Sequence, residues 1–132
     1  MQPIEVFDRG VWKLVPSQDD VSWVHRIAAS RTTSAPLGDF GSLVGDMLEK
    51  GVSAESIARF AKIIGYETAF QLCYHLEDPS ASYQGFSDPE EIAWGLFRVN
   101  PDTNEPLEPM CGIHEIILGM DPSGCEIRPK NA

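Results

Sequence analysis

The sequence predicts a mostly helical α+β fold, with residues 1–132 forming a single domain that contains a small antiparallel sheet. Apolar residues recur at helical spacing through residues 38–78, which is the longest periodic stretch of the chain. Short runs of aromatic and β-branched residues occur near the N-terminus and around residues 94–99. A length of 132 residues with 42% hydrophobic residues is sufficient to bury a core.

The first element is expected to be a β-hairpin over residues 3–15. Two β-prone runs, Ile4 to Phe7 and Val11 to Val15, flank the sequence Asp-Arg-Gly. A glycine between two such runs is typical of a hairpin turn, so this segment predicts two strands of the sheet.

A helix is expected from Ser17 to Ala29. Ser17 is a suitable N-cap, and Asp20 follows three residues later in a loose form of the capping box. The apolar residues share one helical face, and they are Val21, Val24, Ile27 and Ala28. The polar residues that follow, 30–36, predict a connecting loop.

The next helix is predicted over residues 39–50, because apolar residues occur there at i, i+3, i+4, i+7 and i+8: Phe40, Leu43, Val44, Met47 and Leu48. Gly51 fits the left-handed residue that ends many helices. Within the helix, Gly41 and Gly45 are spaced to let a neighbouring element approach closely.

Two further helices are predicted over residues 53–65 and 67–76, separated at Gly65. Ser53 serves as the N-cap of the first, whose apolar face is Ile57, Phe60, Ala61 and Ile64. Phe60 and Phe70 are expected to anchor the core, so that replacing either with alanine would cost about 3–5 kcal/mol.

The second half of the chain contains longer loops. Residues 78–91 and 100–109 are rich in Pro, Ser and acidic residues, which predicts loops, and a strand is expected from Trp94 to Val99 beside the N-terminal hairpin. Ile113 to Met120 favours a short helix, although a buried strand stays open at that length. A turn at residues 121–124 and an extended segment at 125–129 are expected to follow.

The charge balance is unusual, since ten Lys and Arg oppose twenty Asp and Glu for a net charge of −10. Nucleic-acid binding needs clustered cations, so neither nucleic acid nor an anionic membrane is an expected partner. Residues 52–76 resemble a helix-turn-helix only loosely, because the glycine comes too late for its tight turn. The N-terminus lacks the features of a secretory signal, and three cysteines fit a cytoplasmic location with reduced thiols.

Cys73, His75, Cys111 and His114 are the residues that could form a zinc site. Cys111 is also a candidate nucleophile, with His25, His75 or His114 as its base. Zinc is disfavoured, because positions i and i+2 point to different sides of a helix and one ion cannot reach both Cys73 and His75. Paired carboxylates, including Glu115, are a further candidate, but no complete metal or phosphate motif accompanies them. We therefore expect no metal and no cofactor, and a small enzyme using a Cys/His or carboxylate site remains the alternative function.

The leading hypothesis is a small acidic binding protein, without enzymatic activity, for a basic protein partner. Size and charge resemble those of inhibitor or immunity proteins, which is an analogy and not a motif match. The loop after the helices combines aromatic residues with carboxylates, so the expected binding residues are Glu77, Asp78, Tyr83, Phe86, Asp88, Glu90 and Glu91. In the alternative reading, Tyr83 and Phe86 fold back onto the helical core.

Overall fold

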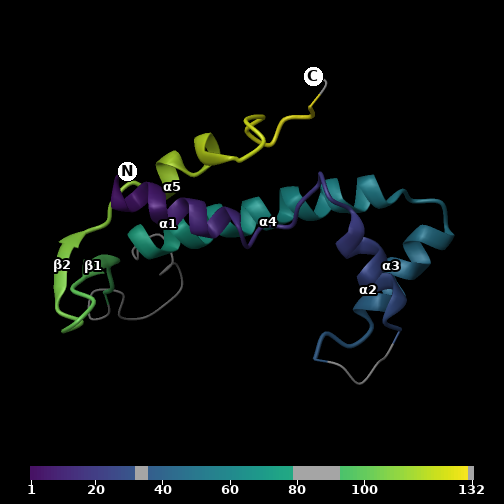
Figure 1. Ribbon diagram of the computed structural model, residues 1–132, viewed down its shortest axis with the longest axis horizontal. Coiled ribbons are helices and arrows are strands. Elements are labelled where there is room, and N and C mark those ends of the chain that lie inside the picture. The colour runs from purple at the N-terminus through teal and green to yellow at the C-terminus, as the bar shows by residue number, and fades with distance from the viewer. Residues whose placement is uncertain (32–35, 79–92, 131–132) are drawn as a thin grey trace, which may run out of the picture. The chain divides into compact units, whose positions relative to one another are not determined.

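The computed structural model describes residues 1–31, 36–78 and 93–130, and it has the mostly helical α+β fold with a small antiparallel sheet that the sequence predicts (Figure 1). The chain divides into two compact units. Unit 1 comprises Met1–Leu14 and Tyr66–Ala132, and unit 2 comprises Val15–Gly65. The long helix α4 (Ala54–Glu77) contributes residues to both units. A single domain over residues 1–132 stays a prediction.

Unit 1 begins with helix α1 (Pro3–Trp12), so the predicted N-terminal hairpin is wrong. Pro3 occupies the first turn of the helix, where its missing N–H is not needed. The Glu5 carboxylate accepts a hydrogen bond from the backbone N–H of Gln2 at 3.0 Å, which stabilises the start of the helix. Helical spacing also places Asp8 and Trp12 on one face, and both are buried. These local signals outweigh the β propensity of the two short runs.

The core of unit 1 forms where α1 packs against the C-terminal part of α4 and against two short helices, α5 (Ile113–Ile116) and η2 (Leu118–Met120). The Trp12 ring stacks on Tyr66 with 5.5 Å between ring centroids. Its indole N–H donates to the Ile117 carbonyl at 2.7 Å, which satisfies a buried donor. The helical interpretation of residues 113–120 is confirmed by α5 and η2, and Ile113 and Ile117 are almost fully buried.

The sheet consists of β1 (Phe97–Val99) and β2 (Pro106–Pro109), which pair antiparallel. The predicted strand is therefore confirmed at Phe97–Val99, but its partner is β2 and not an N-terminal hairpin. Part of the predicted loop over residues 100–109 is thus a strand. Pro106 and Pro109 are compatible with it because a two-stranded sheet has only edge strands.

Unit 2 contains α2 (Ser22–Ala29), α3 (Phe40–Glu49) and the N-terminal part of α4. The buried cluster consists of Val24, Val44, Ala54, Ile57 and Ala58. Helix α2 begins later than predicted, because the Ser17 hydroxyl accepts N–H bonds from Asp19 and Asp20 and closes a turn there. The Asp20 carboxylate then accepts the N–H of Ser22 at 3.0 Å.

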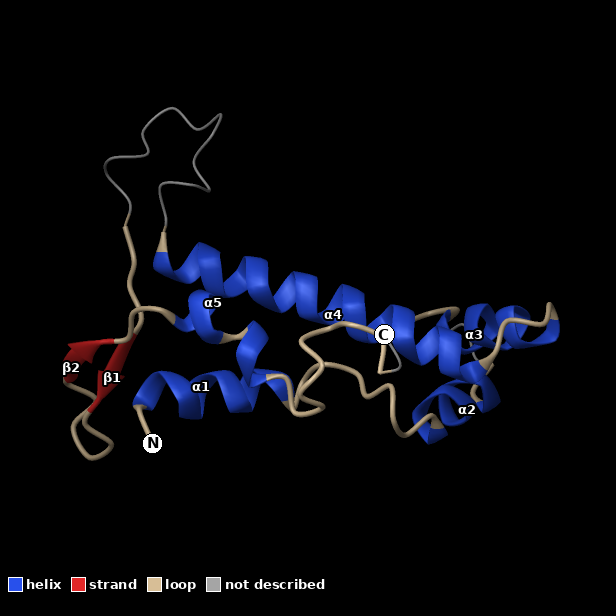
Figure 2. Ribbon diagram, turned by 90° about the horizontal axis from the view of Figure 1, so that it is seen from above, coloured by secondary structure: helices blue, strands red, loops and turns tan. Residues whose placement is uncertain are grey.

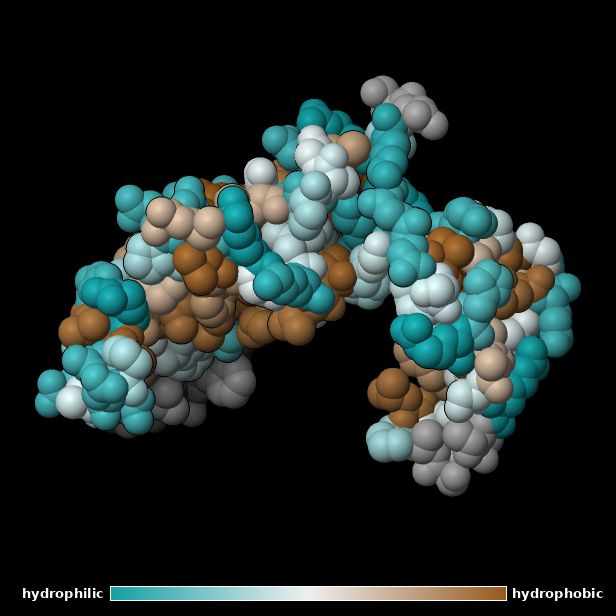
Figure 3. All heavy atoms as spheres, in the orientation of Figure 1, coloured by the Kyte–Doolittle hydropathy of each residue, from teal (hydrophilic) through white to brown (hydrophobic). Residues whose placement is uncertain are grey.

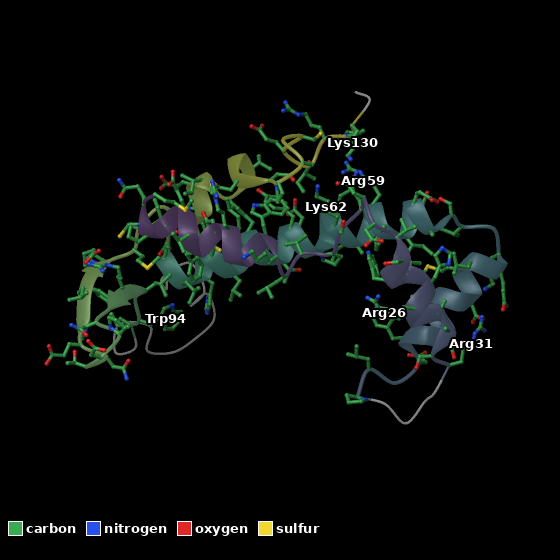
Figure 4. The ribbon with its side chains drawn as sticks, in the orientation of Figure 1. Arg26, Arg31, Arg59, Lys62, Trp94 and Lys130 are labelled. Carbon is green, nitrogen blue, oxygen red and sulfur yellow. The ribbon has the colours of Figure 1, made fainter. Side chains whose placement is uncertain are left out.

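The two glycines of α3 confirm the expected close approach. A Cβ at Gly41 would lie 1.7 Å from the backbone oxygen of Ser30, at the end of α2. A Cβ at Gly45 would lie 2.2 Å from the Arg31 guanidinium, which forms a salt bridge with Glu49 at 2.8 Å. Figure 4 shows Arg31 beside α3. Gly51, with φ of 91°, ends the helix region as predicted.

The predicted break at Gly65 is wrong, since α4 is continuous from Ala54 to Glu77. Glycine inside a helix costs about 1 kcal/mol relative to alanine, which weakens a helix without ending it. The structural reason for this glycine is a close contact: a Cβ there would lie 2.8 Å from Cδ of Pro16. The predicted cap is correct, because the Ser53 hydroxyl accepts the N–H of Ser56 at 3.1 Å.

Phe60 is not a core residue, because its side chain is 69% exposed. The buried side of α4 in unit 2 is formed by Ala54, Ile57 and Ala58. The small alanine side chains let another helix pack closely against this face. Apolar periodicity alone does not decide which of two adjoining apolar faces of a helix is buried. Phe70 is half-buried and its ring contacts those of Tyr66 and Tyr74.

The chain after η2 forms turns and not the predicted extended segment. The Asp121 carboxylate accepts the N–H groups of Ser123 at 2.9 Å and Ile127 at 3.1 Å, so it organises the turn that the sequence predicts at residues 121–124. Glu126 and Ile127 have positive φ values of 48° and 68°, which are incompatible with an extended strand.

Candidate functional site

The β1–β2 hairpin is the most exposed regular element of unit 1. Figure 2 shows it at the end of the unit, near the start of α1 and the last turn of α4. The connection is held by the Asn100 side chain, which accepts the N–H of Asp102 at 2.9 Å and of Thr103 at 3.3 Å. Asn104 adopts a φ of 60°, a left-handed conformation that asparagine tolerates. These turn residues fix the strand pairing.

Both ends of the hairpin are attached to the last turn of α4. Before β1, the Trp94 indole donates to the His75 carbonyl at 2.9 Å, and Figure 4 shows Trp94 beside this end of the helix. After β2, the Glu77 carboxylate accepts the backbone N–H of Gly112 at 2.6 Å and of His114 at 2.8 Å. The Nδ1 atom of His114 lies 2.9 Å from the same carboxylate. We call this set of three contacts to Glu77 the Glu77 clasp.

The surface of the hairpin combines apolar and acidic side chains. Phe97, Val99 and Leu107 are 44%, 43% and 41% exposed. Asp102 and Glu105 are exposed in the connection between the strands and make no ion pair with any described residue. In Figure 3, hydrophobic and hydrophilic side chains lie next to one another at this end of unit 1. Apolar anchors beside free charges are typical of a protein-binding surface.

Charge is distributed unequally between the two units. Unit 1 contains fourteen Asp and Glu against five Lys and Arg, a formal net charge of −9, whereas unit 2 contains six against five, or −1. The acidic character of the protein is therefore a property of unit 1, the unit that carries the hairpin.

A buried carboxylate interacts electrostatically with the Glu77 clasp. Asp8 of α1 is fully buried, and neither of its oxygens has a hydrogen-bond partner among the described residues. Burial, together with the nearby negative charge of Glu77, raises the pKa of Asp8 to about 6. Burial would also raise the pKa of Glu77, but its hydrogen bonds to Gly112 and His114 outweigh burial and lower it. At mildly acidic pH, Asp8 is therefore the protonated member of the pair and Glu77 is the ionised one.

The other candidate chemical groups are the cysteines and His114. Cys73 is buried, and burial raises the pKa of its thiol to about 11, so the nucleophilic thiolate is disfavoured. Cys111 is exposed, and His114 is engaged with Glu77. Within residues 1–31, 36–78 and 93–130, no group of three or more Cys, His, Asp or Glu could hold a metal ion. No helix in these ranges is both long and apolar enough to span a membrane.

The predicted binding residues fall into two groups. Glu77 is engaged in the clasp, and Asp78 lies 3.5 Å from the Tyr74 hydroxyl. Five of them lie outside the described residues: Tyr83, Phe86, Asp88, Glu90 and Glu91. The structure adds β2 and its pairing with β1, which the sequence analysis missed because prolines and acidic residues suggested a loop. The alternation in Pro-Leu-Glu-Pro after an Asn-rich turn is the signal that could have found it.

Comparison of the chain with protein-family models, curated proteins and solved structures returned no match.

Proposed function

We propose that this chain is a small acidic binding protein, without enzymatic activity, whose partner is a basic protein. The observation that carries the proposal is the charge asymmetry, with a formal net charge of −9 on unit 1 and −1 on unit 2. A negative field attracts a basic protein over a Debye length of about 8 Å at physiological salt and increases the rate of encounter. Nucleic acids and anionic membranes would be repelled by the same field.

The β1–β2 hairpin is the proposed contact surface. Phe97, Val99 and Leu107 supply apolar area that a partner can bury, and Asp102 and Glu105 supply charge beside it. Attachment at both ends to α4 supports this role, because a pre-ordered surface loses less conformational entropy on binding. The sequence-predicted residues between Glu77 and Glu91 belong to the same proposal.

An inhibitor or immunity-type role is the form of this function that size and charge favour, by analogy alone. A cytoplasmic location is expected for it. The alternative of a small enzyme is weaker, because His114 is engaged with Glu77 and no hydrogen bond joins Cys111 to a histidine among the described residues.

Capture from a lysate of the native host, with a salt titration, tests the proposal when matched variants are included. The test variant, Asp102→Asn with Glu105→Gln, removes two charges from the hairpin. The control variant, Asp39→Asn with Glu55→Gln, removes two exposed carboxylates from unit 2. A third variant, Phe97→Ser with Leu107→Ser, removes apolar area without changing charge.

The expected result is a basic partner whose capture falls as salt rises and which the two hairpin variants retain poorly. The unit 2 control should retain it as the unchanged protein does. Capture of no basic protein, or equal retention by the hairpin and control variants, would contradict the proposal.

A further inference from the structure

Asp8 and the Glu77 clasp form an electrostatically coupled cluster inside unit 1. The clasp fixes the backbone of Gly112 and His114, immediately after β2, to the last turn of α4. Asp8 approaches this cluster from α1 and senses the charges of both Glu77 and His114. A fully buried carboxylate without a hydrogen-bond partner is rare in native structures, because its ionised form is not compensated.

We propose that Asp8 is a proton-controlled trigger, whose ionisation weakens the Glu77 clasp and thereby frees the base of the β1–β2 hairpin. This inference rests on the proposed function, because it assigns regulation to the surface that binds the partner. The proton released by Asp8 goes to solvent, and no other covalent bond changes.

The groups that face Asp8 do not neutralise its charge. From α4, Glu77 contributes a second negative charge, and Cys73 remains a neutral thiol. From α5, His114 is the one group able to become positive, and it already contacts Glu77. The described residues of η2, Leu118–Met120, carry no titratable side chain. Ionisation of Asp8 therefore adds a second carboxylate charge near the clasp, at a position that solvent does not reach.

The pH range follows from the two carboxylates. Asp8 has a pKa of about 6 in the closed structure, whereas the same group exposed to water titrates near 3.8. At about pH 5 most molecules keep the Asp8 proton and the clasp is undisturbed. At about pH 7.5 both carboxylates are ionised, and opening the clasp exposes Asp8 to water. A difference of about two pKa units corresponds to an increase of up to about 100-fold in the opening equilibrium.

The trigger changes the affinity for a basic partner in the opposite direction to the change in net charge. Raising the pH makes the protein more negative, which by itself strengthens attraction to a basic partner. Loosening the hairpin above pH 6 has the opposite effect, because the partner must then order the surface that it binds. Weaker binding at higher pH is therefore a distinctive consequence.

Amide hydrogen exchange at Gly112 and His114 tests the trigger, because these N–H groups donate to Glu77. Protection factors are compared at about pH 5 and about pH 7.5 in the unchanged protein, in Asp8→Asn and in Glu115→Gln. Asp8→Asn removes the buried charge with little change of shape. Glu115→Gln is the matched control, since it removes an exposed carboxylate from the same helix, α5.

We expect both protection factors to fall by at least about tenfold between these pH values in the unchanged protein and in Glu115→Gln. In Asp8→Asn they should change by less than about twofold. An NMR titration of the Asp8 carboxyl carbon in the unchanged protein should show an inflection near pH 6, which provides a second readout if exchange is too fast to measure. An equal pH response in Asp8→Asn and the unchanged protein would overturn the trigger.

Binding of the basic partner identified by capture separates this inference from the proposed function. If the partner binds through the hairpin at both pH values while the protection factors stay constant, the trigger is wrong and the function stands. If the protection factors follow Asp8 while no basic protein binds at any pH, the trigger stands and the function is wrong.

Discussion

Replacement of Gly41 by alanine should destabilise unit 2, although alanine is the better helix former. A Cβ at this position would lie 1.7 Å from the backbone oxygen of Ser30, 2.6 Å from that of Ile27 and 2.7 Å from the Ser30 carbonyl carbon. All three are backbone atoms, so no side-chain rotation can remove the overlap. The end of α2 must therefore move away from α3.

The expected magnitude combines two opposing effects. Overpacking costs about 1–3 kcal/mol, and a 1.7 Å contact with backbone belongs at the upper end of that range. Alanine restores about 1 kcal/mol of helix propensity relative to glycine. The net effect is a loss of about 2 kcal/mol, and the packing that loosens is the buried cluster that includes Val24 and Val44.

Two other glycines provide matched controls for this measurement. A Cβ at Gly10, inside α1, would meet nothing within 4 Å, so Gly10→Ala should stabilise by about 1 kcal/mol. Gly45→Ala would displace only the Arg31 guanidinium, which can move at the expense of an exposed salt bridge. Its net effect should lie within about 1 kcal/mol of zero.

Urea unfolding followed by circular dichroism, with equal m values required, measures all three differences. The predicted order of stability is Gly10→Ala, then Gly45→Ala, then Gly41→Ala. If Gly41→Ala proved as stabilising as Gly10→Ala, α2 and α3 would not approach one another as closely as the structure shows, and the reasoning would be refuted.

Three further predictions concern buried and exposed groups. The free energy of unfolding of Asp8→Asn, relative to that of the unchanged protein, should be up to about 3 kcal/mol higher at pH 8 than at pH 4, because Asp8 has a raised pKa and its ionisation destabilises the folded unchanged protein as the pH rises from about 4 to 6. Urea unfolding at both pH values measures this difference, and a difference that does not depend on pH would contradict the prediction. Phe60→Ala should change stability by less than about 1 kcal/mol, whereas Ile117→Ala should cost about 2–5 kcal/mol, as thermal unfolding can test; similar losses would mean that the buried faces are wrongly assigned. Trp94→Phe removes the donor to the His75 carbonyl and should lower amide protection in β1, while protection in α2 stays unchanged; loss in both units would indicate general destabilisation.

Local signals in the sequence predicted the parts of the fold that local interactions decide. Helix α3 and its final Gly51 were predicted because apolar spacing and a left-handed glycine act within one segment. The Ser53 cap is local in the same sense. The pairing of β1 with β2 was missed because propensity does not show which run pairs with which.

The candidate site was less accessible to sequence analysis, because its contacts join distant parts of the chain. Glu77 was predicted as a surface charge, yet its partners lie 35 and 37 residues further along the chain. Asp8 appeared to be a turn residue, because it lies in Asp-Arg-Gly. Helical packing buries it instead, and only the folded arrangement of α1, α4 and α5 reveals the two carboxylates as neighbours.

The carboxylates of unit 1 differ in how much they can contribute to steering a partner. Asp8 is neutral below about pH 6, and the charge of Glu77 is compensated locally by three hydrogen-bond contacts. Glu108 is paired with Arg98, so together they contribute little field at a distance. Asp102 and Glu105 have no such compensation among the described residues. They also stand in an exposed connection beside Phe97 and Leu107. Among the three carboxylates of the β1–β2 hairpin, Asp102 and Glu105 should therefore contribute more than Glu108 to the salt dependence of association, because screening acts most strongly on exposed, uncompensated charges.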